Sequence, residues 1–135
     1  MNTLFDEIGG EEPLRRLVDL FYDRMERLES AKVIRDMHPA DLATSRDRLF
    51  WFLCGWTGGP QHYIERRGHP RLRGRHMPFA IDDSAAEQWM LCVNGALQEV
   101  VADADLRHRL SAGLAHVAAF MRNQGKAPHP GLPIT

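Results

Sequence analysis

The sequence predicts an all-α domain, because apolar side chains recur at spacings of three and four residues along most of its length. No stretch shows the alternation of apolar and polar residues that is typical of half-buried strands. The chain has 135 residues, 44% of them hydrophobic, which is enough for one continuous core. These observations predict a single domain over residues 1–123 and a loose tail, rich in proline and glycine, over residues 124–135.

The first substantial helix is expected to end near Leu28. Gly9-Gly10 should separate it from a short segment around Leu4–Ile8. Pro13 suits its first turn, because the missing N–H of proline would have no helical partner there. The apolar face of this helix is predicted to consist of Leu14, Leu17, Val18, Phe21, Met25 and Leu28.

A short turn or helix and then a second substantial helix should follow. Ser30 is a candidate cap for the short segment, which should end at Met37 because Pro39 disfavours helical geometry in the residue before it. Asp41 is expected to cap the second helix, and Gly58-Gly59-Pro60 should stop it. Its inward side is predicted to carry Leu42, Ser45, Leu49, Phe52, Leu53 and Trp56.

The helical pattern breaks from Gly58 to Gly74, where Gly68 and Pro70 interrupt a polar, basic stretch. Only Leu72–Met77 offers a short helical turn. An irregular connection of about fifteen residues inside a compact helical domain usually serves a function. A cofactor that fills the space of a missing helix would explain it.

Two further helices are expected after Asp82–Ser84, with a break at Asp103-Ala104-Asp105 between them. The apolar face of the first should comprise Trp89, Val93, Ala96, Leu97 and Val100. That of the second should comprise Leu106, Leu110, Leu114, Val117 and Met121.

Charge and cysteine content exclude several classes of protein. Seventeen basic and eighteen acidic side chains give a net charge of −1, so no overall field attracts nucleic acid or an acidic membrane. Cys54 and Cys92 lie in apolar helical runs and are expected to be reduced core residues rather than a disulfide. The first ten residues lack the features of a secretory signal, and no stretch approaches the roughly 20 apolar residues of a membrane span. We therefore expect a cytoplasmic protein.

The segment from Gly58 to Ile81, GGPQHYIERRGHPRLRGRHMPFAI, resembles the signature of the group II truncated haemoglobins. Further marks of that family follow in order along about residues 4–123: Gly9-Gly10, Phe21-Tyr22, the position before Pro39, and Trp89. The resemblance implies a truncated-globin two-over-two helical sandwich around haem b. It also implies reversible binding of dioxygen and of other diatomic gases such as carbon monoxide and nitric oxide.

The resemblance assigns roles to the matching residues. His76 corresponds to the proximal iron ligand, and Ser45 and Leu49 correspond to positions that adjust polarity and access on the distal side. The positions that hydrogen-bond the gas are Tyr22, His38 and Trp89. The haem contacts are Phe52, Leu53, Tyr63, Leu72, Arg75, Phe79 and Trp89, with Arg75 beside the propionates. His38 departs from the family, where tyrosine or phenylalanine is most frequent.

The residue chemistry agrees with these roles but leaves alternatives. Imidazole supplies the neutral nitrogen that haem iron needs, although a lone His76 in an arginine-rich segment would more often be a surface residue. A three-histidine zinc site with His62 and His69 is disfavoured, because Gly68 and Pro70 interrupt any helix through all three. Tyr22 and Trp89 are donors to a bound gas or, alternatively, core aromatics.

Five arginines form the basis of the main alternative function: Arg66, Arg67, Arg71, Arg73 and Arg75. One or two would pair with the haem carboxylates, and the rest would be solvated. A nucleic-acid-binding domain without haem is the alternative, ranked lower because the patch lacks a recognition-helix pattern.

The sequence leaves the physiological role open between oxygen transport or storage and the detoxification of nitric oxide or peroxide. It carries no flavin or nicotinamide domain, so repeated oxidation would need an external reductase, and we assign no catalytic residue. A monomer or a weak homodimer is expected.

Overall fold

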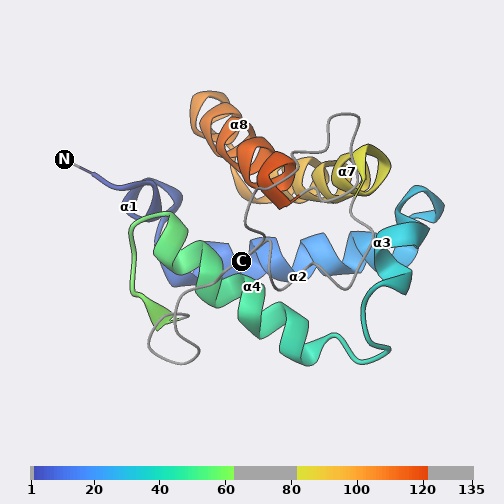
Figure 1. The fold of residues 1–135 in the computed structure, drawn as a ribbon. Helices are drawn as coiled ribbons and strands as arrows, with labels where there is room; N and C mark the ends of the chain where they lie inside the picture. Colours follow the sequence, from blue (N-terminus) through green and yellow to red (C-terminus); the bar gives the residue numbers. More distant parts are fainter. Residues whose placement is uncertain (1, 63–81, 122–135) are drawn as a thin grey trace, which may run out of the picture.

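The computed structural model describes residues 2–62 and 82–121 (Figure 1). Within these ranges all regular structure is helical, as the sequence predicts. The long helices are α2 (Glu11–Arg27), α4 (Ala43–Trp56), α7 (Asp83–Val100) and α8 (Ala104–Met121). The short elements are α1 (Leu4–Ile8), the 3-10 helix η1 (Glu29–Ala31) and α3 (Lys32–Asp36). The turn expected at Leu72–Met77 and the tail lie outside the described residues.

The four long helices form two pairs. Helix α2 packs against α4 in one pair, and α7 packs against α8 in the other. The two pairs meet through extensive contact between α2 and α7, so that α7 and α8 lie above α2 and α4 in Figure 1. This arrangement is the predicted two-over-two sandwich. None of the described helices is both long and apolar enough to cross a membrane.

Most helix boundaries follow from local capping. Asp82 accepts a hydrogen bond from the Ala85 N–H at 2.8 Å, and Asp103 accepts from the first turn of α8, so each carboxylate sits at the positive end of a helix. Asp41 accepts from the Ala43 N–H at 2.9 Å and thus stabilises the start of α4, although Leu42 is the N-cap residue. The predicted cap at Ser30 is wrong, because η1 begins at Glu29 and neither η1 nor α3 has a side-chain cap.

The core lies between the two pairs and follows the predicted faces. On α2, every predicted position except the half-buried Leu28 is at most 4% exposed. On α7 and α8 most predicted positions are also buried: Val93, Ala96, Leu97, Leu106, Leu110, Leu114 and Met121. The other three, Trp89, Val100 and Val117, are half-buried. Cys54 and Cys92 are free and fully buried, as expected. Burial raises the pKa of the Cys54 thiol to about 11, so it is protonated and unreactive at neutral pH.

Helix α4 is less completely covered than predicted. Leu42 and Leu53 are buried, whereas the other predicted inward positions are half-buried: Ser45, Leu49, Phe52 and Trp56. Among the described helices, α4 packs mainly against α2. One side of α4 therefore presents partly exposed apolar groups at helical spacing.

The end of α4 is held by the N-terminal segment. Gly58 has a positive φ of 97°, which lets the chain turn sharply after α4. The Phe5 N–H donates to the Thr57 carbonyl at 2.9 Å, and the Phe5 ring lies directly on Gly59. A Cβ atom at Gly59 would overlap that ring. The glycine is therefore needed for α1 to pack against the end of α4.

Gly59→Ala is expected to destabilise the fold by about 1–3 kcal/mol, because the Phe5 ring must move or the turn must distort. Urea unfolding followed by circular dichroism measures this change. In a Phe5→Ala background, where the ring is absent, the same Gly59→Ala substitution should cost much less. An equal cost in both backgrounds would show that the close approach of Phe5 is not what requires glycine.

Candidate functional site

A small apolar cavity lies where the four long helices meet. Its volume is about 10 Å³, comparable to the space that one water molecule needs. The lining residues are Leu17, Val18, Phe21, Leu49, Leu53, Trp89, Val93 and Leu114. Apart from the indole N–H of Trp89 these groups are apolar, and such cavities stay dry. Three residues predicted for the site, Leu49, Leu53 and Trp89, are thus brought together around an apolar space.

Tyr22 follows the cavity residue Phe21 on α2. Its side chain is buried, and its ring contacts Phe21 edge to face with ring centroids 4.8 Å apart. The hydroxyl donates to the Ser45 carbonyl of α4 over 3.4 Å, which is long for an O–H···O hydrogen bond. Burial raises the pKa of Tyr22 well above that of a free phenol, so the hydroxyl keeps its proton. Tyr22 is therefore a buried donor that is only weakly engaged.

His38 lies next to Tyr22, with ring centroids 5.7 Å apart and the rings edge to face. Its Nδ1 is 2.8 Å from the Ile34 carbonyl oxygen, which can only accept a hydrogen bond. Nδ1 therefore carries the hydrogen, and Nε2 is an acceptor when the ring is neutral. The imidazole that departs from the family pattern thus has its tautomer set by the backbone of α3.

Trp89 approaches the same region from the first half of α7. Its ring contacts Phe21 edge to face at a centroid distance of 5.5 Å, and the side chain is half-buried. In the described part of the chain, no acceptor is hydrogen-bonded to its indole N–H. The ring of Phe21 is thus in contact with both Tyr22 and Trp89, and it links the two donors from separate helices.

Helix α4 supplies four of the predicted site residues at spacings of three and four: Ser45, Leu49, Phe52 and Leu53. They lie on one side of the helix, with Ser45 next to Tyr22 and with Leu49 and Leu53 in the cavity wall. The remaining predicted residues lie outside the described ranges: Tyr63, Leu72, Arg75, His76 and Phe79. The structure thus brings Tyr22, Trp89 and the α4 residues together around Phe21 and the cavity. The predicted iron ligand, His76, lies outside the described ranges.

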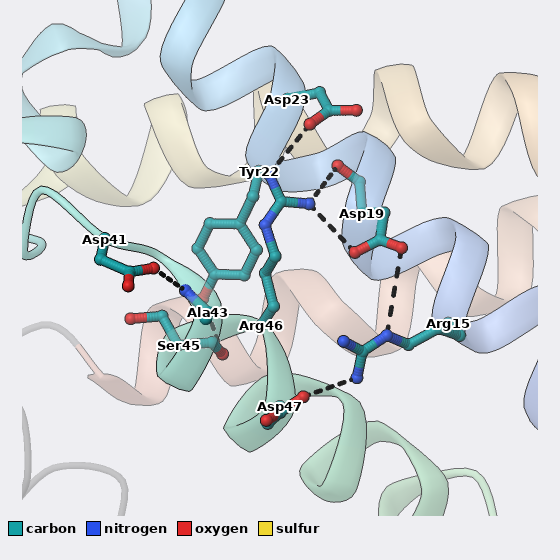
Figure 2. Close-up of polar contacts among 9 residues, drawn as sticks. All are labelled: Arg15, Asp19, Tyr22, Asp23, Asp41, Ala43, Ser45, Arg46 and Asp47. Carbon is teal, nitrogen blue, oxygen red and sulfur yellow. Dashed lines mark hydrogen bonds and ion pairs between the residues drawn. The ribbon is translucent and has the colours of Figure 1, made fainter.

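The sequence reasoning missed a charged group that adjoins Tyr22. The guanidinium of Arg46, on α4, lies over the Tyr22 ring with its central carbon 5.7 Å from the ring centroid. It also pairs with Asp19 and Asp23 on α2 (Figure 2). A signal was present, because the two aspartates are four residues apart and enclose Tyr22 in the sequence. Their partner on another helix could not be read from that spacing.

The comparisons with known proteins identify the family. The sequence model of the bacterial-like globins matches residues 3–123. The chain belongs to the bacterial-like globin family. Among curated relatives, this globin is 38% identical over 121 residues to the group 2 truncated haemoglobin of Bacillus subtilis, covering 90% of this chain and 89% of that protein.

Solved structures agree with the sequence relatives. A cold-adapted truncated haemoglobin of the Antarctic marine bacterium Pseudoalteromonas haloplanktis is 41% identical with a TM-score of 0.88, covering 91% of this globin and 99% of that chain. The group II 2-on-2 haemoglobin of the plant pathogen Agrobacterium tumefaciens is 38% identical with a TM-score of 0.88, covering 92% and 96%.

This globin is therefore a group II truncated haemoglobin, as its sequence resemblance indicates. The family and fold make it a haem globin that binds diatomic gases. The alternative of a nucleic-acid-binding domain finds no support in the family or in the fold.

Proposed function

We propose that this globin binds haem b through His76 and reversibly binds dioxygen, to which Tyr22 and Trp89 would donate hydrogen bonds. Carbon monoxide and nitric oxide would occupy the same place. The observation that carries the distal part of the proposal is the placement of these two donors, on α2 and α7, in contact with Phe21 beside an apolar cavity. The proximal part is supported by the match of Arg75-His76-x-Pro78-Phe79 to the family signature.

The described residues fit a haem group and its gaseous ligand. A porphyrin needs an apolar wall, and α4 offers partly exposed Leu49 and Phe52 beside the buried Leu53. When bound, the haem supplies an iron that takes up diatomic gases. Arg75 would hold the propionates, because a guanidinium pairs well with carboxylates.

The protein's own groups would then act on the gas in two ways. Dioxygen held by haem would draw partial negative charge, so donors in a dry site would stabilise it strongly. The Tyr22 O–H and the Trp89 N–H supply such donors, while the apolar residues Leu49 and Leu53 keep water out. We propose His38 as a third group that would hydrogen-bond the gas, supported by its place next to the Tyr22 ring.

The direct test is to load the purified protein with haem, reduce it, and follow its absorption spectrum. We expect one haem per chain, a dioxygen spectrum that reverses when the gas is removed, and distinct carbon monoxide and nitric oxide spectra. Immediate and irreversible oxidation by dioxygen at every pH would contradict reversible binding.

Transport and detoxification are separated by a second assay. Nitric oxide or peroxide turnover requires electrons, and we propose that an external reductase would supply them. Consumption of nitric oxide by the dioxygen-loaded protein should continue past one equivalent only when a reductase is added. Equal multiple turnover without any reductant would contradict this part of the proposal.

The setting that we propose is the cytoplasm, with the protein a monomer or weak homodimer. The two buried free thiols, Cys54 and Cys92, suit a reducing compartment. Among the described residues, the large exposed apolar side chains stand on three different helices: Val33, Leu91 and Phe120. That distribution favours at most a small interface between copies.

A further inference from the structure

Arg46 joins α4 to α2, the helices of Ser45 and Tyr22. Its Nη1 donates to the Asp19 carboxylate at 3.0 Å and to the Asp19 backbone carbonyl at 3.1 Å, and its Nη2 donates to Asp23 at 2.9 Å (Figure 2). Only 21% of the Arg46 side chain is exposed. A guanidinium that bridges two carboxylates in a half-buried position fixes its geometry more firmly than a single exposed ion pair does.

Tyr22 lies directly beneath this bridge. The two aspartates flank it on α2, and the guanidinium lies over its ring at 5.7 Å. The hydroxyl of Tyr22 reaches the carbonyl of Ser45, the residue that precedes Arg46 on α4. The ring contact and the hydroxyl contact therefore come from neighbouring residues of one helix turn, so a shift of Arg46 would alter both.

We propose that Arg46 is a positioning residue for Tyr22: by tying α4 to Asp19 and Asp23 and covering the ring, it sets the direction and the donor strength of the Tyr22 hydroxyl toward a bound diatomic gas. This inference rests on the distal role proposed for Tyr22.

The physical basis is the effect of a cation on an aromatic face. A guanidinium over a phenol withdraws electron density from the ring, which makes the O–H a stronger donor. The positive charge of Arg46 lowers the pKa of Tyr22, opposing the larger effect of burial, which raises it. Without Arg46 the phenol would be a weaker donor on a less firmly held helix.

Arg15 provides a matched control at the same interface between α2 and α4. It pairs with Asp47 of α4 at 2.8 Å and lies over the ring of Phe50, so it also joins α2 to α4 through an ion pair and a ring (Figure 2). Arg15 also lies 4.0 Å from the Asp19 carboxylate, the limit of an ion pair, but none of its contacts among the described residues is with Tyr22. Its side chain is 41% exposed. If Arg46 acted only by holding α2 against α4, an Arg15 variant should show the same effect. An effect that passes through Tyr22 should be absent from the Arg15 variant.

The test is a double-mutant cycle on the haem-loaded protein. Dioxygen dissociation is measured for Arg46→Gln, Tyr22→Phe, the combined variant and Arg15→Gln. We expect Arg46→Gln to speed dissociation about two- to fivefold, less than the roughly tenfold or more expected for loss of the whole Tyr22 hydrogen bond, because the bond is weakened and not removed. In the Tyr22→Phe background the same substitution should have no further effect, and Arg15→Gln should match the wild type.

A second readout does not depend on gas release. The chain contains two tyrosines, so labelling their Cζ atoms with carbon-13 gives two resonances in the carbon monoxide complex, and Tyr22→Phe identifies one. Arg46→Gln should shift the Tyr22 resonance and raise the infrared carbon–oxygen stretch, while Arg15→Gln should do neither. Arg46→Lys keeps the charge but cannot bridge both aspartates, so it should give an intermediate shift. If Arg46→Gln does not fold, Arg46→Lys replaces it in both measurements.

The outcomes separate this inference from the proposed function. If Tyr22→Phe itself leaves dissociation unchanged, the distal role of Tyr22 is wrong and the inference about Arg46 is overturned with it. If Tyr22→Phe speeds dissociation but Arg46→Gln does not, or acts equally in both backgrounds, Arg46 is only a structural ion pair and the distal role of Tyr22 stands.

Discussion

Replacing His76 with glycine is expected to abolish tight haem binding, because the iron would lose the one protein nitrogen that the family signature assigns to it. The purified variant should contain little haem and should recover it when imidazole is added, since the small ligand can enter the space left by the side chain. Haem content per chain, measured by absorbance, gives the result directly.

His69→Gly is the matched control, because it removes another histidine from the same segment. It should keep the haem content of the wild type. If both variants lost haem equally, the loss would reflect damage to the segment rather than removal of a ligand. If His76→Gly retained haem fully without imidazole, His76 would not be the anchor.

Loss of a distal donor should have the next largest effect. Tyr22→Phe and Trp89→Phe should each remove one of the two hydrogen bonds that we propose for the bound gas. Such a bond is worth about 1.5–3 kcal/mol, which corresponds to a roughly ten- to hundredfold faster release of dioxygen. Stopped-flow dissociation from the ferrous protein measures each rate.

Trp56→Phe serves as the control for Trp89→Phe. Trp56 is a half-buried tryptophan at the end of α4 whose ring lies against Gly113 of α8, and it is not among the cavity residues. Its replacement should leave dioxygen release unchanged. If both Tyr22→Phe and Trp89→Phe released dioxygen at the wild-type rate, the proposal that these two residues donate hydrogen bonds to the gas would be wrong.

The sequence predicts the helices of this globin well because their signal is local. Apolar residues at spacings of three and four mark the buried face of α2, and Asp82 and Asp103 cap α7 and α8 where the pattern begins. Ser30 shows the limit of such reasoning: a good capping residue has no effect when the helix starts one residue before it.

The site was predictable only where the family signature supplied it. Periodicity alone places Tyr22 at the border of an apolar face. It does not place Trp89 beside Phe21 or His38 beside Tyr22. The bridge from Arg46 to Asp19 and Asp23 joins two helices through residues more than twenty positions apart in sequence. Such a contact depends on how the helices cross, which no local pattern encodes.

The central claim, that His76 ligates the haem iron, is tested most directly by the iron–histidine stretching band in the resonance Raman spectrum of the ferrous, gas-free protein. The account predicts that this band is present in the wild type and in His69→Gly and absent from His76→Gly. In His76→Gly it should return with added imidazole and shift to lower frequency when that imidazole carries nitrogen-15. An unchanged band in His76→Gly without imidazole would contradict the account, since another residue would then hold the iron.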